Sequence, residues 1–168
     1  VPKSLRDAFL KGGGLSILKS SEILQIEEIQ EFFEKDSPYT DLVQFESDIA
    51  QICELVLLFS ESPGSFTELG SFSMITEVTE RLLVVIRSKY LSRSSFITKG
   101  SVANLRRDFP NSVYTFADAT IGLVDGVVAS ANPALLVQTL KNPVGLRIAQ
   151  ADSRTTLDRT KFNHLCKL

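Results

Sequence analysis

Apolar residues follow two patterns along this chain, short continuous runs and longer segments with helical spacing. LVLLF (55–59) and LLVVI (82–86) are continuous runs of strand length, as expected for parallel strands covered on both faces. SVYTFA (112–117) predicts a third strand, and LSIL (15–18) predicts a short one near the N-terminus. The chain should therefore contain a sheet of short, mostly buried strands.

Helices are predicted between these runs. Apolar residues recur at helical spacing in SLRDAFLK (4–11), SEILQIEEIQEFFEK (21–35), LVQFESDIAQICE (42–54) and SFTELGSFSMITEVTERL (65–82). Beyond residue 117 we expect two or three short helices, because the Asn-Pro pairs at 132–133 and 142–143 should interrupt a longer one. The alternation of strands and helices indicates an α/β fold with a mainly parallel sheet. In such sheets, ligands bind beyond the carboxyl ends of the strands.

The stretch FSESPGSFTELGSFS (59–73) leaves the carboxyl end of a predicted strand, where ligands are expected. Pro63 and Gly64 suit a tight turn, and Ser65 followed by Glu68 has the spacing of a helix capping box. The free N–H groups of such a helix start suit a phosphate or a ribose hydroxyl. The residues predicted to bind substrate are Glu61, Ser62, Gly64, Ser65 and Thr67.

Glu68 has two interpretations. Its carboxylate could complete the capping box with Ser65, or it could attack an anomeric carbon and form a covalent glycosyl intermediate. The second interpretation needs another acid to handle protons. Glu46 and Asp48 are candidates if their helix starts near the strand ends, and otherwise belong to an ordinary solvated helix face. Glu61 is expected to hydrogen-bond the loop backbone rather than to catalyse.

Composition and charge narrow the class of protein. The chain has 168 residues, 43% of them hydrophobic, which suits one domain with a substantial core. A net charge of −2 gives no overall nucleic-acid signal, and no apolar run approaches the roughly 18 residues of a membrane helix. No signal peptide is evident, and the two cysteines are far apart in sequence. A cytoplasmic protein is therefore expected.

Other candidate sites in the sequence are weak. The glycines at 12–14 follow a helix rather than a strand, so they do not form a dinucleotide fingerprint, and no phosphate-loop or zinc spacing is present. We therefore expect neither a metal nor a cofactor. His164 lacks a serine or aspartate partner and is expected on the surface. The basic residues that could meet phosphates, or form scattered solvated charge, are Arg87, Lys89, Arg93, Lys99, Arg106 and Arg107.

Three segments together resemble one family. LLFSESPGSFTELGSFS closely resembles the core motif of retron effector proteins with a nucleoside 2-deoxyribosyltransferase-like domain, P-E-S-P-G-S-x-x-E-L-G-x-F-S, with Ser60 where proline is usual. KYLSRSSFITKGSVANL (89–105) is similar to the family's lysine-rich segment ending in S-F-I-x-x-G-P-V-x-x-L, with Ser101 replacing proline. FESDIAQICELVLLF (45–59) is a looser match, with Glu54 where aspartate is common.

The resemblance implies a Rossmann-like sheet with Glu68 as a glutamate nucleophile and Glu46 near the second acidic position. It also implies a nucleoside deoxyribosyltransferase-like domain over 1–117, without the family's usual first strand. A helical extension over 118–168 would include the start of a winged-helix-like region. The implied protein is a cytoplasmic N-glycosidase toxin of an antiphage system, a hydrolase or transferase acting on N-glycosyl bonds.

The substrate and partners follow from the same resemblance. NAD or a purine nucleotide or deoxynucleotide would lose its base, and the retron reverse transcriptase with its RNA–DNA hybrid, the msDNA, would restrain the toxin. The apolar composition favours self-association or a larger assembly. Two alternatives stay open. One is a nucleotide-binding sensor without turnover, and the other is a structural module that touches the retron nucleic acid in a salt-sensitive way.

Overall fold

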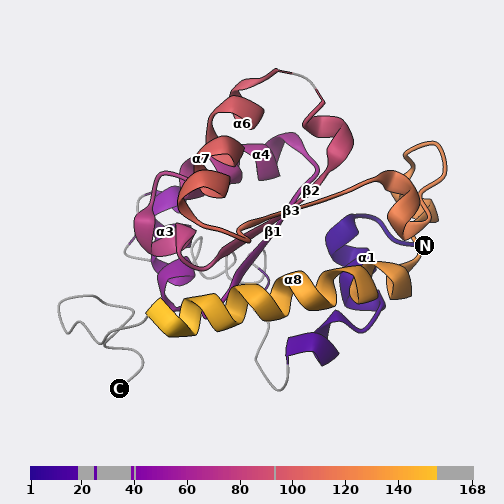
Figure 1. Cartoon of the computed structure of the whole chain (residues 1–168), viewed down its shortest axis with the longest axis horizontal. Coiled ribbons are helices and arrows are strands. Elements are labelled where there is room, and N and C mark those ends of the chain that lie inside the picture. The colour runs from indigo at the N-terminus through magenta and orange to yellow at the C-terminus, as the bar shows by residue number, and fades with distance from the viewer. Residues whose placement is uncertain (19–24, 26–38, 40, 93, 155–168) are drawn as a thin grey trace.

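A parallel three-stranded sheet forms the centre of the described part of the molecule. The computed structural model describes residues 1–18, 25, 39, 41–92 and 94–154. The strands lie in the order β1 (Val56–Ser60), β2 (Leu82–Arg87) and β3 (Val113–Phe116) (Figure 1). Ser60 pairs with Ile86, and Arg87 with Phe116, so all three strands end at the same edge of the sheet. The strands predicted after residue 54 are confirmed.

Helices cover both faces of this sheet. They are α1 (Leu5–Lys11), α3 (Leu42–Ile52), α4 (Pro63–Phe72), α5 (Thr76–Thr79), α6 (Phe96–Lys99), α7 (Ser101–Asp108) and α8 (Pro133–Arg154), with single 3-10 turns η1 (Gly14–Leu18), η2 (Ser88–Tyr90), η3 (Asp118–Ile121) and η4 (Val128–Ser130). Figure 1 shows α4, α6 and α7 above the strands and α1 and α8 below them. This arrangement is an α/β fold compatible with a Rossmann-like sheet.

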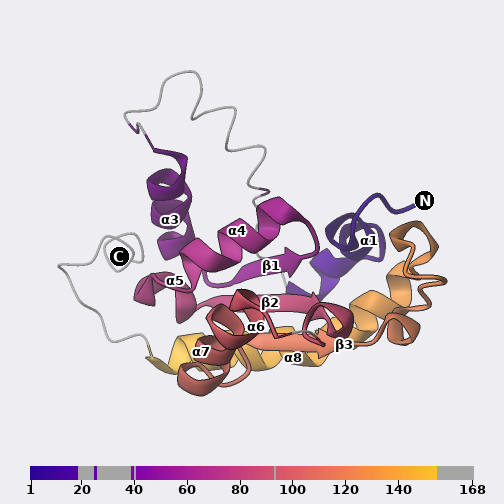
Figure 2. The ribbon, with the colours of Figure 1, turned by 90° about the horizontal axis from the view of Figure 1, so that it is seen from above.

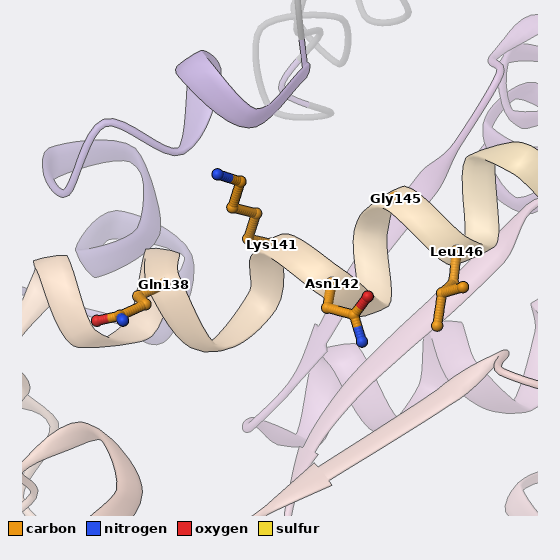
Figure 3. A pocket seen from close by; sticks show the side chains of 5 residues that line it. All are labelled: Gln138, Lys141, Asn142, Gly145 and Leu146. Atoms are coloured by element: carbon orange, nitrogen blue, oxygen red, sulfur yellow. The ribbon is translucent and has the colours of Figure 1, made fainter.

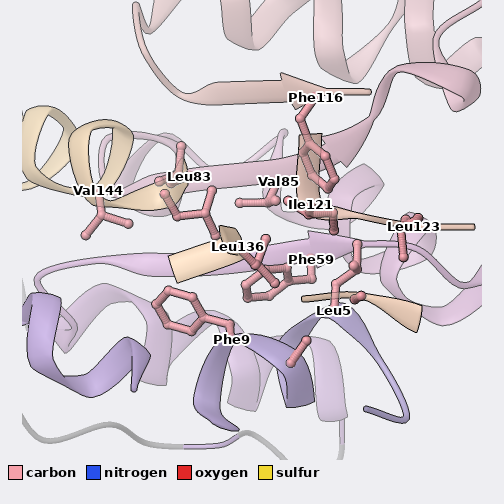
Figure 4. Packing of buried hydrophobic residues seen from close by; sticks show 13 residues of the cluster. Leu5, Phe9, Phe59, Leu83, Val85, Phe116, Ile121, Leu123, Leu136 and Val144 are labelled. Atoms are coloured by element: carbon pink, nitrogen blue, oxygen red, sulfur yellow. The ribbon is translucent and has the colours of Figure 1, made fainter. Parts of the chain in front are cut away.

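One apolar cluster packs on each face of the sheet, because successive residues of a strand point to opposite sides. Leu58 faces α4 and α7, whereas Phe59 faces α1 and α8 and meets the Phe9 ring with centroids 5.7 Å apart (Figure 4). Every residue of β2 is buried, and each apolar side chain so buried contributes about 1.5–3 kcal/mol. The middle strand therefore holds both layers together.

The start of the chain and the region after β1 differ from the prediction in three places. Residues 15–18 form part of the 3-10 turn η1 rather than a strand. The helix predicted over 65–82 is two helices, α4 and α5, because Ser73 ends the first and its hydroxyl donates to Gly70 O at 2.9 Å. The predicted helix over 21–35 and the C-terminal segment that includes His164 lie outside the described residues.

The interruption predicted at Pro143 does not occur, since α8 continues through it to Arg154. An internal proline costs about 3 kcal/mol through a lost hydrogen bond and a clash with the preceding turn. Leu140 and Val144, on either side of Pro143, are completely buried against the sheet. Their burial offsets the penalty, so tertiary packing decides the length of this helix.

Candidate functional site

Charged side chains from all three strand ends gather on the face of the sheet that α1 covers. Glu61 follows β1, Arg87 ends β2, and Asp118 begins the turn after β3. Glu61 continues the alternation of β1 and faces the same side as Phe59. This edge is where ligands bind in parallel α/β sheets.

Glu61 stabilises the start of α1. Both of its carboxylate oxygens accept from the backbone N–H of Leu5, at 2.9 and 3.0 Å. Burial raises the pKa of Glu61, while the backbone N–H groups of Leu5 and Arg6 and the charge of Arg87 oppose that shift. The expectation that Glu61 bonds backbone is confirmed, but the backbone belongs to α1 rather than to its own loop.

Arg87 is a buried cation and not part of a solvated charge pattern. Its side chain is 2% exposed, its Nε donates to Asp118 Oδ1 at 2.6 Å, and its Nη2 donates to Asp118 Oδ2 and to the Gly126 carbonyl at 2.9 Å. The hydrogen bond from Arg87 holds the pKa of Asp118 below its usual value. Sequence reasoning missed this pair because Asp118 lies 31 residues away.

Gly126 lets the hairpin after β3 close over this pair. The turn runs from Val124 to Val127, with Asp125 and Gly126 in the left-handed region at φ 50° and 73°. A Cβ on Gly126 would lie 3.2 Å from Arg87 Nη2 and 3.4 Å from Asp118 Oδ2. Any larger residue would therefore push against the ion pair as well as strain the backbone.

The other basic residues lie differently. Arg106 donates to Thr115 Oγ1 at 2.6 Å, and Arg107 pairs with its neighbour Asp108 at 2.7 Å, both on the surface. Lys89 and Lys99 are exposed, and Arg93 lies outside the described residues. Apart from Arg87, these described residues therefore lie on the surface, where they are solvated and open to a partner.

After β1 the chain enters α4, which covers the opposite face of the sheet. Ser62 is the N-cap: its Oγ accepts from Ser65 N at 3.2 Å, while Ser65 Oγ accepts from Ser62 N at 2.9 Å. Ser65 Oγ also accepts from Glu61 N at 2.9 Å. The capping box is therefore made by Ser62 and Ser65, and the prediction that Ser65 and Glu68 form it is wrong. Pro63 explains the earlier start, because proline is favoured at the first helical position.

Glu68 lies well inside α4. It is the sixth residue of the helix, roughly 7–9 Å along the axis from its start, and its side chain is half-buried. Helical side chains tilt toward the N-terminus of their helix, which is the end beside the carboxyl end of β1. Glu68 is therefore not the capping residue of α4, because Ser62 and Ser65 form the cap.

The remaining predicted binding residues line the first turn of α4. Thr67 Oγ1 donates to Pro63 O at 3.1 Å, so this hydroxyl serves the helix itself. Gly64 is exposed, and a Cβ built there would have only Ser62 Oγ, at 3.9 Å, within 4 Å. The Cβ side of Gly64 is therefore open to an approaching ligand.

The structure does not bring the two other acids to this edge. Glu46 is buried on α3, and α3 contacts α5, the short helix that precedes β2. The strands point toward α1, and Figure 2 shows α3 beside α5 at the other end of the sheet. Asp48 accepts hydrogen bonds from Tyr39 at 2.8 Å and Gln44 at 3.0 Å. Both acids therefore lie toward the amino ends of the strands.

A shallow hollow on α8 is separate from these residues. It is lined by Gln138, Lys141, Asn142, Gly145 and Leu146, which Figure 3 shows along one helix. No residue of the carboxyl-end loops contributes to it.

Among the residues that the structure describes, no three His, Cys, Asp or Glu side chains are placed to hold a metal. In the same part of the chain, no helix combines the length and apolar character needed to cross a membrane.

Comparison with known proteins gives consistent matches. A family model described as "STM3845 retron effector protein" matches residues 2–168. The chain is 40% identical over 72 residues to an Escherichia coli protein of retron Ec86, covering 43% of this chain and 24% of that protein. It is 29% identical over 69 residues to a retron Ec73 protein of the same organism, covering 41% of this chain and 22% of that protein.

Both relatives carry the name "putative ribosyltransferase/DNA-binding protein". Each match spans less than a quarter of the relative's own length. The larger part of each relative therefore has no counterpart in the aligned segment.

Proposed function

Because the chain belongs to the STM3845 retron effector family, we propose that it is the N-glycosidase effector of a retron antiphage system. The proposed reaction cleaves the N-glycosidic bond of NAD, or of a purine nucleotide or deoxynucleotide, with Glu68 as nucleophile. The ribosyltransferase element in the relatives' names supports chemistry at an anomeric carbon.

The observation that carries this proposal is the position of Glu68. It lies on the helix that starts where β1 ends, and Ser62 and Ser65 satisfy the cap without it. A half-buried carboxylate on this helix, at the end of the sheet where ligands bind, is suited to covalent catalysis. This placement supports the nucleophile interpretation over the capping one.

The chemistry would proceed in two steps. A Glu68 oxygen attacks the anomeric carbon, and the bond from that carbon to the base nitrogen breaks with its electron pair leaving on the base. Nicotinamide departs from NAD as a neutral molecule, whereas a purine takes up a proton from water as it leaves. Water then attacks the glycosyl ester, releasing the sugar and restoring the carboxylate. The exposed first turn of α4 at Gly64 would receive the phosphate or sugar.

Glu46 is the second acid that the family resemblance implies. Its helix packs against α5, whereas the helix of Glu68 starts at the opposite end of the sheet. We therefore propose that Glu68 alone contacts the reacting carbon and that Glu46→Gln lowers turnover much less than Glu68→Gln. Equal losses in the two variants would place Glu46 in the reaction as well.

The test is base release by the full-length protein. Wild type and Glu68→Gln are incubated with NAD and a panel of purine nucleotides and deoxynucleotides, with and without the retron reverse transcriptase and its msDNA. Glutamine keeps the shape of the side chain but cannot form the glycosyl ester, so we expect a loss of at least about 10³-fold.

The matched control is Glu80→Gln, a partly buried glutamate at the end of α5, which should leave base release unchanged. Release by Glu68→Gln at the wild-type rate would refute the nucleophile. Binding of a nucleotide without any base release, with or without the partner, would instead select a nucleotide sensor.

Contact with the retron nucleic acid is a separate proposal. The relatives' names include DNA binding, and Arg106 and Arg107 lie exposed on α7. We propose that this helix approaches the msDNA, so Arg107→Gln should reduce binding and flatten its salt dependence by about one unit of slope. Unchanged affinity and slope in a salt titration would rule this helix out.

A further inference from the structure

Ser60, the last residue of β1, has a buried hydroxyl with no partner. The residue is 0% exposed, and among the described residues Ser60 Oγ is the buried side-chain oxygen or nitrogen that makes no hydrogen bond. Ser112 offers a direct comparison within the same sheet region. It is also 0% exposed, but its Oγ donates to Leu105 O at 3.1 Å. Ser60 therefore carries a desolvation cost that Ser112 avoids.

The Ser60 side chain lies on the face of the sheet that leads into α4. Leu58, two residues earlier, packs in the cluster with Leu69 of α4, and Ile86 opposite Ser60 belongs to that cluster. Strand alternation puts the Ser60 hydroxyl on this same face. It therefore lies at the carboxyl end of β1, beside the first turn of α4, where Figure 2 shows the chain turning from β1 into that helix.

The surroundings of this hydroxyl restrict what can bind it. Its neighbours on the same face, Leu58 and Ile86, are apolar, and the buried cation Arg87 pairs with Asp118 on the opposite face. A phosphate buried here would have to draw a cation from its present partner, since Arg87 pairs with Asp118 and Lys89 Nζ lies 5.2 Å from the centroid of the Tyr90 ring. A neutral hydroxyl suits the place better, because it can both donate to and accept from a serine.

We propose that Ser60 binds a hydroxyl of the substrate's sugar and makes the protein specific for sugars that carry it. This inference rests on the proposed function, which places a glycosyl group beside α4. A site built to bond a substrate hydroxyl discriminates strongly against the analogue that lacks it, because its own polar group then stays unpaired. Ser60 is thus a specificity residue, not one that reacts.

Access requires a side chain over the end of β1 to turn aside. Tyr90 meets this requirement: it is half-buried, and its hydroxyl reaches Glu61 O only at 3.4 Å, the long end of hydrogen bonding. Its ring packs edge-on to Phe66 of α4, with centroids 5.2 Å apart. The ring also lies 5.2 Å from Lys89 Nζ and 6.0 Å from Arg87 Cζ, so a rotation that admits the sugar would break these cation–π contacts as well.

Binding measurements test the proposal independently of turnover. Calorimetry compares AMP, 2′-deoxy-AMP and 3′-deoxy-AMP on full-length Glu68→Gln, with and without Ser60→Ala. We expect Ser60→Ala to weaken AMP about tenfold and to leave the analogue without the recognised hydroxyl unchanged. Equal effects on all three ligands, no effect on any, or no binding of any would overturn it.

Thermal unfolding of the ligand-free proteins supplies the matched control. Ser60→Ala should leave the melting temperature unchanged or raise it, whereas Ser112→Ala should lower it without changing ligand discrimination. A lower melting temperature for Ser60→Ala with unchanged binding would mean that the hydroxyl serves the fold, and would overturn the proposal. Base release unaffected by Ser60→Ala would reject this inference alone, while binding without release would reject only the glycosidase.

Discussion

At the scale of single residues, the ion pair of Arg87 and Asp118 is the interaction with the clearest energetic consequence. The guanidinium is 2% exposed and the Asp118 side chain 28% exposed, so the cation would be left buried if the carboxylate were lost. Breaking a fully buried pair costs about 3–5 kcal/mol, and the partial exposure of Asp118 places this pair at about 2–3 kcal/mol.

Asp118→Asn should therefore lower the free energy of unfolding by about 2–3 kcal/mol at pH 7. The folded pKa of Asp118 is lowered, so the pair stabilises the fold fully above the ordinary carboxyl pKa of 3.8 and less as pH falls through the folded value. Denaturant titrations of wild type and variant should consequently converge as pH drops below about 4. A constant difference down to pH 2 would contradict this assignment.

At the scale of elements, α8 shows how burial overrides a local signal. Pro143 removes one backbone donor in the middle of the helix, yet Leu140 and Val144 remain completely buried on the sheet. The helix therefore persists because of what it covers rather than because of its own propensity.

Pro143→Ala should stabilise the protein by about 1–2 kcal/mol, since it restores a hydrogen bond and relieves the clash with the preceding turn. The gain is smaller than the full proline penalty because alanine leaves the unfolded chain freer. Urea unfolding measures it, and Leu146→Ala, at a 45% exposed position of the same helix, should change stability by less than 1 kcal/mol. A loss of stability in Pro143→Ala would show that the packing of α8 needs the proline geometry.

The same elements show what the sequence could predict. The continuous apolar runs of β1 and β2 were sufficient to predict both strands, because a short run of this kind is typical of a strand buried on both faces. The start of α4 was misplaced by two residues because Ser62 and Ser65 are both good N-cap residues. Only the reciprocal hydrogen bonds between them show that Ser62 is the N-cap. Ser60 stood out in the sequence only as a serine where the family motif has proline, and its missing partner is visible only in three dimensions.

At the scale of the whole molecule, Arg147 links α8 to the other end of the sheet. Its fully buried side chain donates to Leu82 O at 2.9 Å and to Thr79 O at 2.5 Å, so one guanidinium serves α5, β2 and α8 together. Arg147→Met should destabilise the fold by about 2–4 kcal/mol, because two buried carbonyls lose their donor.

Circular dichroism and tyrosine fluorescence should report this loss in coincident transitions, as expected if helices and sheet unfold as one unit. Two separated transitions would instead show that α8 can leave the sheet on its own. The exposed Lys141→Met on the same helix is the control and should keep the wild-type midpoint.

The contact between α1 and α8 also determines when the protein can finish folding. Both helices pack in the cluster around Phe59 and Val85, yet roughly 120 residues of chain separate them, and such distant contacts form slowly. During synthesis α1 leaves the ribosome before α8, so its contacts with α8 form only after the strands between them have emerged. The described fold can therefore close only after α8 has been translated, and until then the cluster around Phe59 and Val85 stays incomplete.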